Sequence, residues 1–222
     1  MKNNVLIIAA HPDDEILGCG GTIAKHIFNN DLVTILFICD GETSREKNLQ
    51  QLQYRNKSAK KASKLLGCQD PIFLNFPDNR LDSVIFLEIV QKIELYIEKI
   101  KPNIIYTHHY NDLNIDHQLT CKSVITACRP LPGHYVKSIF LFEVMSSSEW
   151  GIFNEKFIPN KFIDITVHKD KKEEALKVYK NEMRDYPHPR SKKNIDAIEQ
   201  LRGSVSNIEY AEAFQIYRQI IS

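Results

Sequence analysis

Three carboxylates and an imidazole follow a short apolar run near the start of the chain. Residues 5–9 are typical of a buried strand, and His11, Asp13, Asp14 and Glu15 come directly after it. Like charges this close together repel, and burying them is costly without a cation. Zinc accepts histidine and carboxylate ligands, and a further carboxylate can act as a base. The segment therefore indicates either a metal site or a solvated acidic turn that caps the following helix.

A second polar cluster follows another apolar segment, residues 103–107. Residues 108–117 contain three histidines and two aspartates. Because parallel strands present functional groups at their carboxyl ends, both clusters would meet at one edge of a sheet. His11, Asp14 and His117 would then supply two nitrogens and one oxygen, with positions left for water and substrate. The alternative is that the first two histidines only end a strand and that His117 is an ordinary residue at a helix start.

The pairing of AHPDDE at residues 10–15 with Asp-His at 116–117 resembles the PIG-L/LmbE family of zinc-dependent de-N-acetylases. These two motifs together are specific, and the resemblance extends through most of the chain. The supporting segments are GCGGT at 18–22, YR at 54–55, FPD at 76–78, EV, SSS and W within 143–150, YPHPRS at 186–191 and YAEAF at 210–214.

The resemblance implies a role for each polar residue of the two motifs. His11, Asp14 and His117 would bind Zn²⁺, and Asp13 would be the general base. Adjacent aspartates on a turn project in different directions, so one can bind metal while the other faces the water. Asp116 would orient a neighbouring ring or the bound water.

The chain departs from the family pattern at Asn114. Many members have a histidine three residues before the metal-binding histidine, and it is credited with stabilising the oxyanion. The Asn114 amide can donate a hydrogen bond to an oxyanion, but it cannot supply a proton. His188 or another group would then have to act as the acid. The predicted catalytic residues are therefore Asp13, Asn114 and Asp116.

Four further residues are predicted to bind substrate. Arg55 and Arg190 lie near family motifs and would hold an anionic or polyhydroxyl substrate, unless they are surface arginines. Asp78 would bond sugar hydroxyls, unless it is a turn aspartate beside Pro77. His188 completes this set. The substrate class that the family implies is a small N-acetylated sugar or glycoconjugate.

The order of apolar and polar segments predicts an α/β fold. We expect a Rossmann-like, doubly wound, mostly parallel sheet with helices on both faces, formed by one domain over residues 1–222. The predicted strands are residues 5–10, 32–39, 72–75, 104–107, 138–144 and 162–166. The predicted helices are residues 22–29, 45–66, 84–100, 117–128, 169–183 and 209–221.

A nucleotide-binding oxidoreductase is the competing interpretation. Gly18, Gly20 and Gly21 follow a strand and open a helix, and Asp40 stands where a ribose-binding acid would lie. However, Ile23 occupies a position that needs a small residue, and HPDDE separates the strand from the glycines. An amidase acting on another small N-acyl substrate is the second alternative. A binding module with lost activity is disfavoured because the polar residues of both motifs are intact.

The composition fits an intracellular enzyme. The chain has 222 residues and a net charge of +1, so we expect no nucleic-acid partner. The first apolar run is too short for a signal sequence or a membrane span, which predicts a cytoplasmic protein. Five cysteines without CxxC spacing predict reduced, mostly buried thiols. The sequence is compatible with a homo-oligomer.

Overall fold

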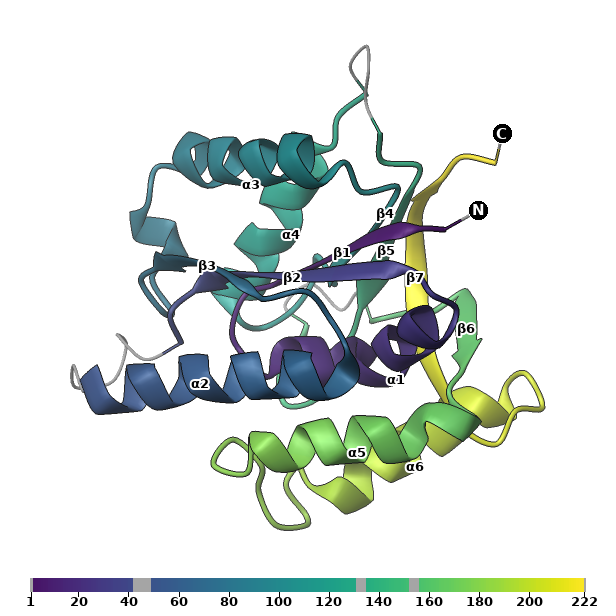
Figure 1. The fold of residues 1–222 in the computed structure, drawn as a ribbon. Helices are drawn as coiled ribbons and strands as arrows, with labels where there is room; N and C mark the ends of the chain where they lie inside the picture. Colours follow the sequence, from purple (N-terminus) through teal and green to yellow (C-terminus); the bar gives the residue numbers. More distant parts are fainter. Residues whose placement is uncertain (1, 42–48, 131–134, 152–155, 222) are drawn as a thin grey trace.

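A seven-stranded mixed sheet forms the centre of the computed structural model, which describes residues 2–41, 49–130, 135–151 and 156–221 (Figure 1). The strand order is β3-β2-β1-β4-β5-β7-β6. The first five strands pair in parallel, whereas β7 runs antiparallel to both β5 and β6. The α/β, mostly parallel fold is thus confirmed. The strands are β1 (Asn4–Ala9), β2 (Leu32–Cys39), β3 (Ile72–Phe76), β4 (Ile104–His108), β5 (Ser138–Phe142), β6 (Lys161–Asp164) and β7 (Ala211–Gln219).

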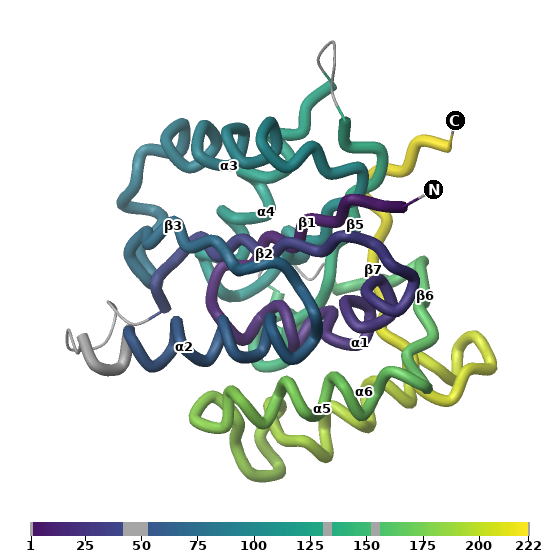
Figure 2. The backbone as a smooth tube through the Cα atoms, in the orientation of Figure 1, coloured from purple at the N-terminus to yellow at the C-terminus, as the bar shows by residue number. Residues whose placement is uncertain are grey.

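Helices cover both faces of the sheet. One face carries α3 and α4, and the other carries α1 and α2 (Figure 1). Figure 2 shows α5 and α6 as an outer layer beyond α1, and α5 contacts both α1 and α2. The α-helices are α1 (Asp14–Phe28), α2 (Leu49–Leu66), α3 (Phe86–Ile100), α4 (Ile115–Ala127), α5 (Lys169–Val178) and α6 (Lys192–Ser204), and the short 3₁₀ helices are η1 (Leu81–Ser83), η2 (Ser148–Trp150) and η3 (Thr166–His168).

The central strand β1 explains why its sequence is a continuous apolar run. Val5 and Ile7 belong to the core beneath α1 and α2, whereas Leu6 and Ile8 belong to the core beneath α3 and α4. All four side chains are fully buried. A parallel strand covered on both faces needs apolar residues at every position. This strand is therefore fixed in place and delivers the residues after Ala9 to one edge of the sheet.

The predicted helix at residues 209–221 is wrong, because this segment is the strand β7. Its backbone pairs with β5 on one side and with β6 on the other, and residues 211–214 are all buried. Tertiary pairing of this kind overrides local helix preference. The sequence analysis also missed α6, which begins where Ser191 accepts a hydrogen bond from the Asn194 backbone N–H. The predicted helix 169–183 ends at Val178, and of the predicted helix 45–66, residues 45–48 lie outside the described residues.

The glycines at 18, 20 and 21 lie inside α1 and form no phosphate-binding turn. A Cβ atom on Gly18 would collide with the Phe142 ring, and one on Gly21 would lie 2.7 Å from Ile165 Cγ2. These glycines therefore allow α1 to pack closely on its neighbours. The helix is kinked at Cys19, where φ is −151° and ψ is 25°.

The kink is stabilised by Glu212 from β7. The backbone N–H groups of Gly21 and Thr22 donate to the two Glu212 carboxylate oxygens at 2.9 and 2.7 Å. Lys172 Nζ of α5 lies 2.7 Å from Glu212 and 2.9 Å from Glu199 of α6. All three charged residues are buried. One polar network thus joins α1, α5, α6 and β7.

Two further expectations can be compared with the structure. No helix in the described ranges is long and apolar enough to cross a membrane. All five cysteines are free, and four of them are buried while Cys68 is half-buried, as the sequence predicts.

Replacing Glu212 with alanine should destabilise the fold. The variant loses the acceptor of two helix N–H groups and one of the carboxylates that face Lys172. We expect the free energy of unfolding to fall by about 3 kcal/mol in urea denaturation, as for other broken buried ion pairs. Glu209 is exposed, so Glu209→Ala should stay within about 0.5 kcal/mol of the wild type. Equal stability of the two variants would show that Glu212 does not anchor α1.

Candidate active site

The two polar motifs meet at the carboxyl edge of neighbouring strands. β1 and β4 pair in parallel, so the chain leaves both strands on the same side of the sheet. The turn after β1 brings in His11, Asp13 and Asp14, and the start of α4 brings in Asp116 and His117. The convergence expected from a parallel sheet is therefore observed.

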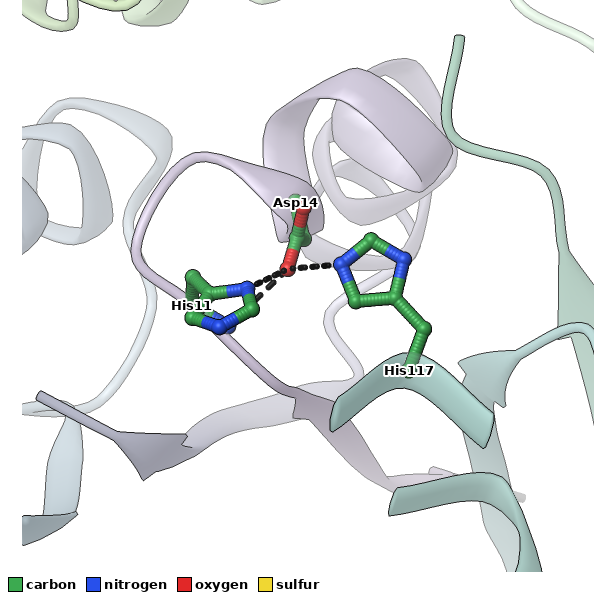
Figure 3. Close-up of side chains that lie close together, drawn as sticks. All are labelled: His11, Asp14 and His117. Atoms are coloured by element: carbon green, nitrogen blue, oxygen red, sulfur yellow. Dashed lines mark hydrogen bonds and ion pairs between the residues drawn. The ribbon is translucent and has the colours of Figure 1, made fainter. Parts of the chain in front are cut away.

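His11, Asp14 and His117 form a compact group of buried donors (Figure 3). Asp14 Oδ2 lies 3.3 Å from His11 Nδ1 and 3.2 Å from His117 Nε2. Ligands of a zinc ion with bonds of about 2.0–2.2 Å are spaced similarly. Asp14 Oδ1 is buried and, among the described residues, has no hydrogen-bond partner. The geometry and this unpartnered oxygen fit a zinc ion.

The other nitrogen of each ring faces a carboxylate. His11 Nε2 lies 3.0 Å from both Asp116 Oδ2 and Asp78 Oδ1. His117 Nδ1 lies 3.2 Å from Asp112 Oδ1. A carboxylate in this position fixes the orientation and proton position of a metal-binding imidazole. The proposed ligand atoms are therefore Nδ1 of His11 and Nε2 of His117.

Asp112 is a site residue that the sequence analysis missed. Besides His117, it faces the hydroxyl groups of Ser147 and Ser148, which donate to Asp112 Oδ2 at 3.1 and 2.6 Å. Burial opposes its ionisation, but His117 and these hydrogen bonds hold the pKa of Asp112 below its ordinary value. The available signal was a second acidic residue, besides Asp116, between the second strand end and His117.

His108 supports the site without belonging to the donor group. It is the last residue of β4, and its Nε2 accepts a hydrogen bond from the Ala10 backbone N–H at 2.8 Å. Its ring stacks on His117, with 3.9 Å between the ring centroids. Burial, and then the neighbouring His117, hold the pKa of His108 well below its ordinary value. His108 is therefore a neutral ring that packs against the His117 side chain.

Asp13 has a strained backbone with φ 128° and ψ −32°, outside the region that residues with a side chain normally adopt. Such a conformation costs of order 1–3 kcal/mol and persists only when its surroundings hold it. The Asp13 N–H donates to Glu15 Oε2 at 2.9 Å, and the Tyr179 hydroxyl donates to Glu15 Oε1 at 2.6 Å. Because all three residues are buried, Glu15 and Tyr179 act as a clamp on this peptide.

Two arginines contact the Asp13 carboxylate from the same side. Arg190 Nη1 lies 2.9 Å and Arg55 Nη2 lies 3.5 Å from Asp13 Oδ2. Asp13 Oδ1 is buried and has no hydrogen-bond partner within the described residues. Burial raises the pKa of Asp13, and Arg190 opposes this rise. One oxygen of Asp13 is thus held by arginine, and the other remains available to a ligand.

A polar pocket of about 280 Å³ opens above these residues. This volume lies just below the usual range for small-molecule sites, which begins at about 300 Å³. The pocket wall includes all four predicted substrate-binding residues, Arg55, Asp78, His188 and Arg190. The other lining residues are His11, Asp13, Asn79, Asn114, Ser146, Glu182 and Arg184.

Asn114 caps a helix in addition to its predicted role as an oxyanion donor. It is the N-cap of α4, because its Oδ1 accepts from the backbone N–H groups of Asp116 at 2.8 Å and His117 at 3.4 Å. Its Nδ2 donates to Asn79 Oδ1 at 3.2 Å. The amide has a second N–H, and the residue lines the pocket. A hydrogen bond from the Asn114 amide to an oxyanion remains a prediction.

The chain belongs to the PIG-L family, whose model is described as GlcNAc-PI de-N-acetylase and matches residues 6–128. It is 29% identical to the uncharacterized deacetylase YaiS of Escherichia coli over 136 residues, which are 59% of this chain and 71% of that protein.

Solved structures share the fold. N,N'-diacetylchitobiose deacetylase from Pyrococcus horikoshii is 22% identical, with a TM-score of 0.78 over 96% of this chain and 83% of that one. The 4-carboxy-2-hydroxymuconate hydratase GalB of Pseudomonas putida is 21% identical, with a TM-score of 0.80 over 100% and 98%. Since one is named a deacetylase and the other a hydratase, the fold alone does not define a reaction.

Removal of the Arg190 charge should change the pH dependence of the site. A general base acts in its ionised form, and Arg190 lowers the pKa of Asp13. In Arg190→Gln this pKa should rise, so the acid limb of kcat/KM should move to higher pH. Arg184 lines the same pocket but donates to the carbonyl oxygens of Asn181 and Met183, so Arg184→Gln should leave the limb in place. If the acid limb of kcat/KM lies at the same pH in both variants, Arg190 does not lower the pKa of Asp13.

Loss of the Tyr179 hydroxyl should loosen the clamp on Asp13. Tyr179→Phe leaves a buried Glu15 oxygen without its donor, which should lower the free energy of unfolding by about 1–3 kcal/mol. The Asp13 amide proton should also exchange faster with deuterium, as measured by NMR. The Tyr210 hydroxyl accepts an exposed hydrogen bond from Gln200, so Tyr210→Phe provides the control. Unchanged exchange at Asp13 would contradict the clamp.

Proposed function

We propose that this chain is a zinc-dependent hydrolase that removes an N-acetyl group from an amino sugar or sugar conjugate of the GlcNAc type. The observation that carries the proposal is the convergence of His11, Asp14 and His117 beside Asp13 at the base of a polar pocket. The description of the family model as a de-N-acetylase supports the reaction. The name of the chitobiose deacetylase supports the class of substrate.

The residues around the pocket suit amide hydrolysis by water. A zinc ion on His11, Asp14 and His117 would polarise the acetyl carbonyl and lower the pKa of a bound water to about 7. Asp13 would take the proton of the attacking water on Oδ1, while Arg190 holds Oδ2. The Asn114 amide would donate to the oxyanion of the tetrahedral intermediate.

The leaving amine needs a proton as the carbon–nitrogen bond breaks. His188 lies in the pocket wall, and its Nδ1 accepts a hydrogen bond from the Arg190 backbone N–H at 3.0 Å. This contact leaves Nε2 as the nitrogen that would carry the proton. Asp13, once protonated, is the other group in the pocket that could supply it.

The pocket wall favours a hydroxyl-rich ligand of limited size. Arg55, Arg190 and Asp78 provide both donors and acceptors, as sugar hydroxyls require. An amidase acting on another small N-acyl compound would use the same donors and the same base. A screen of N-acetylated sugars, nucleotide sugars and oligosaccharides against non-sugar N-acyl amines, with acetate or acid release as the readout, tests the proposal. If the protein hydrolyses the non-sugar amides alone, the sugar deacetylase proposal fails and the amidase takes its place.

Two variants should separate metal binding from proton transfer. We expect about one zinc ion per chain by elemental analysis, lost in the His11→Ala, His117→Ala double variant. Asp13→Asn should keep the zinc and the fold but lose turnover by roughly 10²–10⁴-fold, the usual range for an acid–base group. Loss of zinc in Asp13→Asn would mean that Asp13 and Asp14 have exchanged roles. Zinc retained by the double variant would contradict the ligand assignment.

A serine at position 114 should separate the helix cap from the predicted oxyanion donor. Serine caps a helix about as well as asparagine, so Asn114→Ser should unfold at a temperature close to that of the wild type. It lacks the amide N–H, and kcat should fall by about 10²–10³-fold with little change in KM. Asn114→Ala should show the same kinetic loss and also lose about 1 kcal/mol of stability. If Asn114→Ser keeps the kcat of the wild type, Asn114 serves as the helix cap and not as the oxyanion donor.

A further inference from the structure

The second nitrogen of the His11 ring faces its own group of potential metal ligands. Nε2 lies 3.0 Å from Asp116 Oδ2, and Cys39 Sγ lies 3.2 Å from the same oxygen. The three donor atoms lie within 4.8 Å of one another, and all three residues are buried. Cys39 comes from the end of β2, and Asp116 from the first turn of α4. Neither belongs to the donors around His11 Nδ1.

More negative groups gather around Nε2 than one ring proton can satisfy. Asp78 Oδ1 also lies 3.0 Å from this nitrogen, so two carboxylates face a single N–H group. Asp116 accepts additional hydrogen bonds from the backbone N–H groups of Asn79 at 2.6 Å and Leu81 at 3.1 Å. These hydrogen bonds and the contact with His11 fix the carboxylate in place.

The donor set has the chemistry of a zinc or cadmium site. Thiolate, imidazole and carboxylate are ligands that these soft or borderline cations accept together. Ligand atoms around a tetrahedral zinc ion lie about 3.3–3.8 Å apart, given bonds of about 2.0–2.3 Å. The observed contacts of 3.0 and 3.2 Å need only a small expansion to reach this spacing. An ion would enter from the pocket, which both His11 and Asp78 line.

We propose that His11 Nε2, Cys39 Sγ and Asp116 form a second, weaker site for a thiophilic divalent cation such as Zn²⁺ or Cd²⁺, with Asp78 at its rim, and that occupancy of this site inhibits the enzyme. Binding releases one proton from the thiol and one from Nε2 to the solvent, with no change of oxidation state. The cation must displace both protons and must share the His11 ring with the first ion, so the second site is weaker than the first.

Inhibition follows from the residues that the two sites share. A cation on Nε2 takes Asp116 away from the ring that it orients, and its positive charge repels the ion bound at Nδ1 of the same ring. The same cation attracts the carboxylate of Asp78, which lines the pocket. The loss of turnover rests on the proposed function, whereas the binding of a second ion does not.

Titration with Cd²⁺ tests the site on the intact protein without any substrate. Equilibrium dialysis should show two bound ions, and the sulfur-to-metal charge-transfer band in the ultraviolet should appear only with the second. Cys39→Ser should keep the first ion and lose both the second ion and the band. Cys121 is a buried thiol of α4 outside this group, so Cys121→Ser should behave as the wild type. If Cys39→Ser does not fold, Cys39→Ala replaces it.

A kinetic measurement completes the test. Excess Zn²⁺ should inhibit turnover of the wild type, and the inhibition constant should rise at least about tenfold in Cys39→Ser. A charge-transfer band that accompanies the first ion, a band that survives in Cys39→Ser, or only one bound ion at saturating Cd²⁺ would each overturn the second site. If no acetylated substrate is turned over, the proposed function fails, and the dialysis and absorbance results still decide whether the second site exists.

Discussion

The strained peptide of Asp13 is the constraint on which the arrangement of the site depends. Asp13 and Asp14 are adjacent, yet one carboxylate must join two histidines and the other must face the pocket. A φ of 128° at Asp13 turns the two side chains apart, and the buried Glu15 and Tyr179 hold that turn. Since Tyr179 directly follows α5, the outer helical layer takes part in positioning the proposed base. The motif at residues 10–15 is thus sufficient to suggest the chemistry but insufficient to build the site.

The imidazole rings divide the polar interior into separate environments. Each ring of His11 and His117 directs one nitrogen toward Asp14 and the other toward a second carboxylate. The orientation of each ring is therefore set largely by Asp112 and Asp116, which do not line the pocket. Asp112 and its two serine partners serve His117 in this way, and Asp116 with its backbone N–H partners serves His11. Asp116 and His117 both depend on the Asn114 cap for their place at the start of α4.

The sequence predicted the parallel half of the fold and the grouping of the two motifs, because both follow from local rules. The apolar run before His11 is typical of a strand buried on both faces, and parallel strands end at one edge. It did not predict β7, since residues 211–219 are a strand because they pair with β5 and β6, which lie far away in the sequence. It also did not predict the Asp13 conformation. Nor did it predict the contact of Tyr179 with Glu15, which joins residues 164 positions apart. Distant partners of this kind leave no local pattern.

The position of β7 also affects how the chain folds during synthesis. β7 pairs with β5 and β6 on its two sides, yet the ribosome makes it after both of them. Domains begin to fold while the chain is still growing. Until residues 211–219 have emerged, β5 presents an unpaired edge and the kink in α1 lacks the carboxylate that satisfies its N–H groups. An unpaired strand edge invites pairing with other chains, so the nascent protein passes through an aggregation-prone stage that a chaperone would shield.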